Sequence, residues 1–224
     1  MTVADPESES LNDLLGESGL ETLDNSQIAE FEMYLELILK WNSRFNLTAI
    51  RDREGILRRH FVECTACARF LPSGVRTLLD FGSGAGFPGI PIAICRPEIK
   101  VTLAESQAKK AGFLHEVVRT LGVDAKVFVG RAESIGSCFD CVTLRAVDQM
   151  SNAVAAAIPL VASGGALVAM TTEGSLAQIM GKAGESVHWG VPRQIAGSSQ
   201  GVLLSGFRET VPRGTVLPNV PRGT

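Results

Sequence analysis

The sequence has no unbroken apolar run of the roughly 18 residues that a transmembrane helix needs. Its first 36 residues contain no lysine or arginine, so the basic region that opens a secretory signal is missing. Both absences argue against membrane insertion and secretion. They predict a soluble, cytoplasmic protein.

Cysteine is also sparse, and its five residues are an odd number, which argues against a fully paired disulfide framework. Cys64 and Cys67 form one C-x-x-C pair, and Cys138 and Cys141 form another. Zinc ribbons separate such pairs by about 15–20 residues, whereas 70 residues intervene here. We therefore expect buried free thiols and no metal site.

The charges are unevenly distributed along the chain. Residues 1–36 hold ten acidic residues, while the rest holds 14 acidic residues and all 21 basic ones, so its net charge is +7. A basic body is consistent with a polyanionic substrate, which the acidic leading segment would repel or mimic. Ordinary variation of a solvated surface explains the same asymmetry equally well.

With 224 residues and 45% apolar content, the chain is long enough for one substantial core. Apolar runs begin at Thr77 and alternate with helical patterns, which predicts an α/β fold with a doubly wound, mostly parallel sheet. We expect strands over 77–80, 100–105, 125–129, 139–144 and 165–170, then an antiparallel hairpin over 186–195 and 201–207. Helices are predicted from 26, over 53–71 and over 175–183. The predicted division is a largely disordered acidic segment (1–25), a helical extension (26–75), a cofactor-binding domain (76–210) and a flexible tail (211–224).

The first of these strands ends at Asp80 and leads into a loop crowded with glycine, Gly82-Ser-Gly-Ala-Gly-Phe-Pro-Gly89. Such a loop lets the backbone approach a nucleoside-like cofactor closely. The loop fits two patterns: G-x-G-x-x-G of dinucleotide sites, and D-x-G-x-G-x-G of class I S-adenosylmethionine (SAM) methyltransferases. Because Pro88 and Pro91 remove N–H donors that a pyrophosphate needs, we favour SAM. A structural turn remains the alternative. The expected cofactor contacts are Gly82, Ser83, Gly84, Gly86 and Phe87.

A second strand ends at Glu105, nineteen positions after Gly86. This is close to the spacing of about 20 residues expected for a carboxylate that binds ribose hydroxyls. Glu105 is therefore the predicted ribose ligand, although a solvated acid at a strand end is the alternative. His60 lies within a predicted helix, where we expect it to be a packed histidine and not a catalyst.

Two later strand ends face the same edge of the sheet if the topology is as predicted. The third strand is followed by Ala132 and Glu133, which we expect on the adenine side of the cofactor; the start of a surface helix is the alternative. The fourth strand ends at Arg145, whose planar guanidinium suits a phosphate or a guanine edge. A structural ion pair is the other possibility for Arg145.

Taken together, these motifs closely resemble the RsmG (GidB) family. The resemblance covers about residues 26–175 and rests on the following residues: Trp41-Asn42, Phe45-Asn-Leu-Thr48, Arg51-Asp52, Arg59-His60, Asp80 with the glycine loop, Arg96-Pro97, Glu105-Ser106, Phe113-Leu114, Gly130-Arg-Ala-Glu133 and Arg145-Ala146. The family methylates a guanine N7 of bacterial 16S ribosomal RNA with SAM. By this resemblance, Gly82, Phe87, Ala132, Glu133 and Arg145 match its SAM-contacting positions. Two departures are Glu63-Cys64, where members usually carry Asp-Ser, and Met170–Gly174, which lacks a lysine.

The resemblance implies a SAM-dependent enzyme acting on 16S rRNA or the small ribosomal subunit. We expect no metal and no membrane partner, and we expect a monomer. Guanine N7 carries a free lone pair, so alignment and charge stabilisation suffice and no general base is needed. Arg145 is the candidate catalytic residue. The RNA contacts expected from this interpretation are Asn46, Arg51, Arg58 and Arg59. Alternatives are a catalytically silent nucleic-acid adaptor and an NAD-dependent oxidoreductase.

Overall fold

A computed structural model describes residues 9–209 of the chain. The predicted flexible tail, 211–224, therefore lies outside the described residues, as do residues 1–8. No helix within residues 9–209 is long and apolar enough to cross a membrane.

An eight-stranded sheet forms the centre of the molecule, with the order β3-β2-β1-β4-β5-β8-β6 and β7 paired to β8. The strands are β1 (Thr77–Phe81), β2 (Lys100–Glu105), β3 (Ala125–Val129), β4 (Phe139–Arg145), β5 (Val161–Thr172), β6 (Val187–Trp189), β7 (Arg193–Gln194) and β8 (Gly201–Arg208). Strands β1 to β5 are parallel, whereas β8 runs antiparallel to β5, β6 and β7. This confirms the predicted doubly wound sheet. The strand expected over 186–195 is split in two, and the break contains Pro192, which has no N–H for a strand ladder.

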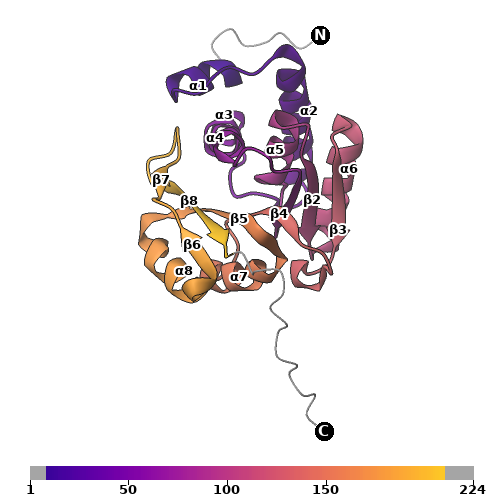
Figure 1. The fold of residues 1–224 in the computed structure, drawn as a ribbon. Coiled ribbons are helices and arrows are strands. Elements are labelled where there is room, and N and C mark those ends of the chain that lie inside the picture. The colour runs from indigo at the N-terminus through magenta and orange to yellow at the C-terminus, as the bar shows by residue number, and fades with distance from the viewer. Residues whose placement is uncertain (1–8, 210–224) are drawn as a thin grey trace, which may run out of the picture.

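Helices cover both faces of the sheet, with α2, α4 and α5 above it and α7 and α8 below it in Figure 1. The α-helices are α1 (Leu11–Glu17), α2 (Asn25–Asn42), α3 (Arg53–Ile56), α4 (Glu63–Phe70), α5 (Gly89–Cys95), α6 (Ala108–Leu121), α7 (Met150–Ala157) and α8 (Leu176–Ala183). A π-helix, η1 (Leu57–Val62), joins α3 to α4. Short 3-10 turns occupy η2 (Ala132–Ser134), η3 (Ile158–Leu160), η4 (Glu173–Ser175) and η5 (Gly184–Ser186).

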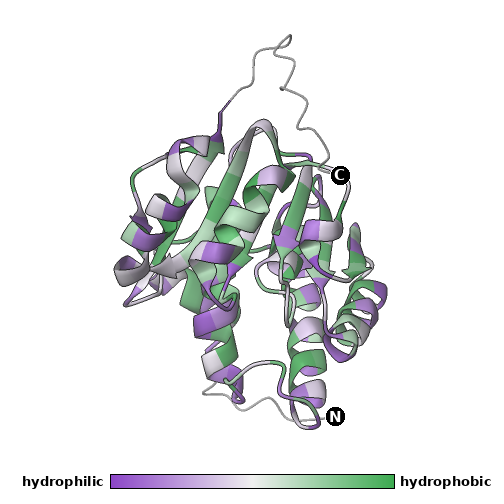
Figure 2. Ribbon diagram, turned by 90° about the horizontal axis from the view of Figure 1, so that it is seen from below, coloured by the Kyte–Doolittle hydropathy of each residue, from purple (hydrophilic) through white to green (hydrophobic). Residues whose placement is uncertain are grey.

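Alternating residues of β1 supply two separate cores. Leu78 packs into the core that holds Phe31 of α2 and Phe113 of α6, whereas Leu79 packs into the core around Val154 of α7. In Figure 2 the strands are largely green, and purple residues recur on the helices around them. The predicted helical extension thus shares one core with the sheet. The domain boundary between residues 75 and 76 stays a prediction.

The prediction of disorder over 1–25 is wrong for its described part. Helix α1 begins at a capping box in which the Ser10 and Asp13 side chains bond each other's backbone N–H groups. Its residues Leu11, Leu14 and Leu15 are at most 2% exposed. These leucines recur at helical spacing and form an apolar stripe. The prediction of disorder gave more weight to the acidic residues of this segment than to that spacing.

The helix predicted over 53–71 is confirmed as one continuous helical stretch through α3, η1 and α4. Its π-helical part carries Arg58, Arg59 and His60. Short π-helical segments of this kind occur frequently at functional sites.

Candidate functional site

A cleft of about 560 Å³ opens at the carboxyl ends of the parallel strands. This volume lies within the range of about 300–1,000 Å³ typical of small-molecule sites. The lining residues come from the loop before α3, the helix η1, the glycine loop after β1, the end of β2 with the start of α6, and the end of β4: Leu47, Thr48, Ala49, Ile50, His60, Gly82, Ser83, Gly84, Ala85, Phe87, Glu105, Ser106, Gln107, Lys110, Arg145, Ala146, Val147 and Asp148.

The glycine loop needs its glycines for two different reasons. Gly82 and Gly84 line the cleft with φ values of +73° and +58°, a left-handed conformation that favours glycine. Gly86 does not line the cleft. A Cβ on Gly86 would lie 2.8 Å from the hydroxyl oxygen of Tyr34, which itself donates a hydrogen bond to the Ala85 carbonyl. Gly86 therefore leaves room for Tyr34 of helix α2 to hydrogen-bond to the loop.

Glu105 closes the loop from the end of β2. One carboxylate oxygen accepts the Gly84 N–H at 2.9 Å, and the other accepts the Gln107 N–H at 2.7 Å. Glu105 is 6% exposed and lines the cleft. A carboxylate has about four acceptor positions, so each oxygen retains capacity for a further donor such as a ribose hydroxyl.

Asp80 lies fully buried beneath the same loop. Its carboxylate accepts the Gly89 N–H at 3.1 Å and the Thr143 hydroxyl at 3.2 Å. A Cβ on Gly89 would lie 2.7 Å from an Asp80 oxygen, so glycine is required for this contact. Burial raises the pKa of Asp80 to about 6, although the hydrogen bonds and the charge of Arg145 oppose the shift.

Arg145 reaches the cleft from the end of β4, but its guanidinium is paired with protein groups. It donates to Glu63 at 2.7 Å and to the Arg59 carbonyl at 2.6 Å. The side chains of Arg145 and Glu63 are only 12% and 6% exposed. The guanidinium carbon also lies 5.6 Å from the centre of the Phe87 ring. The structure thus shows the ion pair as well as the cleft position, and a ligand contact of Arg145 stays a prediction.

His60 lies beside this ion pair and is packed in place, as its helical pattern predicts. Its Nε2 is 2.8 Å from the Thr48 hydroxyl oxygen, and its ring centre is 4.5 Å from that of Phe87. Burial, together with the positive charge of Arg145, lowers the pKa of His60 to about 3. The imidazole is therefore neutral at physiological pH.

The two residues expected on the adenine side lie outside the cleft lining. Ala132 is buried in the core that contains Phe81, and the Glu133 carboxylate pairs with Arg131 at 2.8 Å on the surface. Both belong to the 3-10 turn η2, next to the end of β3. Their contact with a cofactor stays a prediction. The ion pair of Glu133 with Arg131 agrees with the alternative, a position on the surface.

Three of the four predicted RNA contacts are exposed near the cleft. Asn46 and Arg51 bond each other at 2.6 Å, which leaves the Arg51 charge without a carboxylate in this contact. The Arg59 side chain is 64% exposed, with its Nε 3.3 Å from Glu63. These residues stay predicted RNA contacts.

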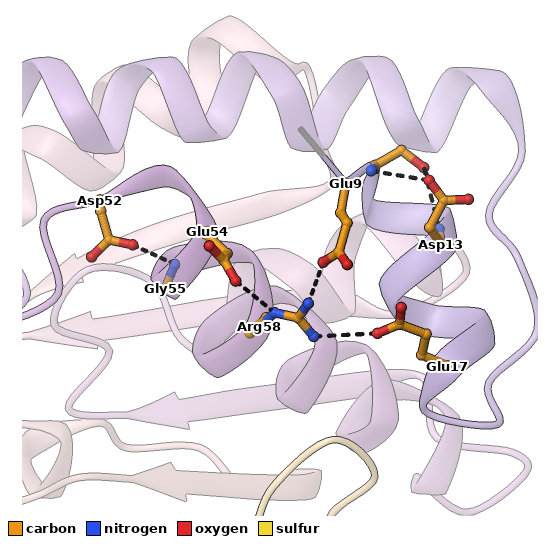
Figure 3. A network of polar contacts seen from close by, with 8 residues as sticks. Glu9, Asp13, Glu17, Asp52, Glu54, Gly55 and Arg58 are labelled. Carbon is orange, nitrogen blue, oxygen red and sulfur yellow. Dashed lines mark hydrogen bonds and ion pairs between the residues drawn. The ribbon is translucent and has the colours of Figure 1, made fainter. Parts of the chain in front are cut away.

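Arg58 is the exception, because three carboxylates surround its guanidinium (Figure 3). It pairs with Glu9, with Glu17 at 3.3 Å and with Glu54 at 3.1 Å. Glu9 and Glu17 belong to the segment that contains α1, and Glu54 lies one helical turn before Arg58. The structure thus shows Arg58 paired with the α1 segment, and its contact with RNA stays a prediction.

Several lining residues escaped the sequence reasoning. Lys110 and Asp148 enter the cleft from segments that carry no fingerprint, and Thr48, the last residue of the Phe45–Thr48 motif, had no predicted contact. The only signal for Lys110 was its position soon after the strand that ends at Glu105. Among the described residues, no group of three or more His, Cys, Asp or Glu side chains is placed to hold a metal ion.

A family model described as GidB, rRNA small subunit methyltransferase G, matches residues 27–197. Two similar proteins are both named ribosomal RNA small subunit methyltransferase G. The protein from Roseiflexus sp. strain RS-1 is 43% identical over 145 residues, which span 62% of this chain and 62% of the relative. The Exiguobacterium sibiricum protein is 43% identical over 164 residues, or 70% of this chain and 68% of the relative.

Solved structures show the same fold at low identity. A methyltransferase from Pyrococcus furiosus superimposes with a TM-score of 0.59 at 12% identity, covering 83% of this chain and all of that one. A SAM-dependent methyltransferase from Aquifex aeolicus gives a TM-score of 0.56 at 16% identity, covering 70% of this chain and 94% of that one. These similarities concern the architecture alone.

Proposed function

Because this chain belongs to the GidB family of rRNA small subunit methyltransferase G proteins, we propose that it transfers a methyl group from SAM to a guanine N7 of 16S ribosomal RNA. The family match over residues 27–197 includes every segment that lines the cleft. That overlap is the observation that carries the proposal.

The cleft suits SAM better than a dinucleotide. The buried carboxylate of Asp80 lies against the glycine loop, where it would repel a pyrophosphate. Pro88 and Pro91 leave the start of α5 without two N–H donors that a phosphate would need. Glu105 holds ribose hydroxyls in this proposal, and Gly82, Ser83 and Gly84 lie along the cofactor.

When bound, SAM supplies an electrophilic methyl group on a sulfonium. Guanine N7 attacks with its own lone pair, so the protein has no proton to remove before transfer. His60 and Asp80 fit this chemistry, because the His60 Nε2 is engaged by the Thr48 hydroxyl and the Asp80 carboxylate is fully buried. The work of the side chains is to align the two reactants and exclude water.

Arg145 has two roles in the proposal. It closes the floor of the cleft against Phe87, and its remaining donor capacity is directed to the guanine O6 or a nearby phosphate. Arg145→Ala is expected to lower methyl transfer sharply. A variant with wild-type turnover would remove Arg145 from the mechanism.

The direct test incubates the protein with SAM labelled in its methyl group and small ribosomal subunits that lack the modification. Label is expected in 16S rRNA, at N7 of a guanine after nuclease digestion. Calorimetric binding of SAM without any transfer of label would favour the silent adaptor, and binding of NAD instead would favour the oxidoreductase.

We further propose that the protein works in the cytoplasm as a monomer. The lining of the cleft by residues 47–148 of a single chain supports this assignment. Sedimentation of the protein during turnover measures whether it is a monomer.

A further inference from the structure

An aromatic ring and several cations border the cleft where α2 ends and α6 begins. Phe45 lies two residues before the cleft-lining Leu47 and is 37% exposed. The ammonium of Lys109 lies 5.4 Å from the centre of the Phe45 ring. The adjacent Lys110 lines the cleft itself, and Arg44 is exposed next to Phe45. We call Arg44, Phe45, Lys109 and Lys110 the Phe45 platform.

The Phe45 ring is held from within the protein. Its centre lies 5.5 Å from the Trp41 ring, which in turn packs edge-on against the buried Phe113 at 5.6 Å. The Trp41 Nε1–H donates to Glu116 at 2.8 Å. The platform therefore presents a supported aromatic surface to solvent. Within residues 9–209, Phe45 and Phe207 are the two aromatic rings among the exposed large apolar side chains.

The charge around the platform is positive. Glu116 is engaged by the Trp41 indole and by the Lys40 ammonium at 3.3 Å, so it offsets Lys40 and not Lys109. Lys109 contacts a π-face, which leaves its full charge available to an anion. Aromatic rings beside cations are how proteins bind single-stranded nucleic acid, with bases stacked on the rings and phosphates on the cations.

We propose that the Phe45 platform binds the unpaired RNA strand next to the methylated guanine, an inference that rests on the proposed function. A neighbouring base stacks on Phe45, and the Lys109 ammonium moves from the ring to a phosphate. Lys110 guides the same strand into the cleft. The platform selects a nucleotide that is already unstacked, because a duplex presents no free base face at this rim.

The test compares Phe45→Ala with Phe207→Ala, and Lys109→Gln with Lys100→Gln. The control Phe207 is 47% exposed and pairs with Ala166, towards the opposite edge of the sheet from the cleft. Lys100 is exposed at the first residue of β2, at that same opposite edge. Each protein is assayed for SAM binding by calorimetry and for KM towards small ribosomal subunits that lack the modification.

Phe45→Ala is expected to raise KM for subunits about tenfold, as loss of one base stack does, with SAM affinity unchanged. Lys109→Gln is expected to make the fall of log affinity with log salt less steep by about 0.7 to 0.9, which corresponds to the loss of one phosphate contact. The control variants should keep wild-type values. Equal KM values for Phe45→Ala and Phe207→Ala would overturn the proposal.

Filter binding of protein-free 16S rRNA separates this inference from the proposed function. Absence of methyl transfer by the wild-type protein counts against the function alone. Weaker rRNA binding by Phe45→Ala than by Phe207→Ala still supports an RNA surface, whereas equal binding refutes the platform whatever the turnover.

Discussion

His60 allows a direct test of the electrostatics beside the cleft, because its pKa of about 3 lies far below the value of 6.5 for a free histidine. Between these two pH values the unfolded chain carries a proton on His60 that the folded protein does not. Stability therefore falls as the pH is lowered through this window. At pH 5, which is 1.5 pH units below the unfolded pKa, the loss is about 2 kcal/mol at 1.36 kcal/mol per unit.

Asp80 titrates in an overlapping range with the opposite sign. Its folded pKa of about 6 exceeds the ordinary aspartate value of 3.8, so protonation on acidification favours the folded state. At pH 5 this opposes the His60 effect by about 1 kcal/mol. A pH series on the wild-type protein alone would thus understate the loss of stability that His60 causes. The loss must be compared between the wild-type protein and a variant without His60.

The experiment measures urea unfolding of the wild-type protein and His60→Gln at pH 7 and pH 5. Glutamine retains a polar group near the Thr48 hydroxyl and removes the titration. Between the two pH values the wild-type protein should lose about 2 kcal/mol more than the variant. His188→Gln removes an imidazole whose side chain is 72% exposed and is the matched control. Equal losses in wild type and His60→Gln would show that the folded protein accommodates a protonated His60.

Three further predictions concern the loop and the ion pair. Glu105→Gln should weaken SAM binding about 10- to 100-fold in calorimetry, because charged hydrogen bonds are worth about 1.5–3 kcal/mol; Glu98→Gln, an exposed carboxylate paired with Arg96, is the control. Glu63→Gln leaves Arg145 without its carboxylate, and urea unfolding should show a loss of about 1.5–3 kcal/mol; wild-type stability would mean that the pair contributes nothing. Gly86→Ala should lower the melting temperature more than Gly74→Ala, because both glycines have left-handed φ values but only Gly86 would also clash. Equal shifts would remove the Tyr34 contact as the reason for Gly86.

The sequence by itself determined the sheet and the position of the cleft. Apolar runs of strand length, separated by helical patterns, predict parallel strands, and the glycine loop after Asp80 marks the edge where a ligand binds. Glu105 was found in the same way, because a strand end fixes where its last side chain lies. These features follow from local backbone preference and burial, which a short stretch of chain encodes.

The tertiary structure alone decided which charges are free. Arg145 meets Glu63 across 82 positions, and Arg58 meets Glu9 and Glu17 across 49 and 41 positions. Sequence patterns do not distinguish paired arginines from unpaired ones, because the pairing depends on how distant helices pack. The same packing placed Lys109 over Phe45 and ordered α1 through its buried leucines. Long-range contacts of this kind arise only when the whole core forms, so no local pattern contains them.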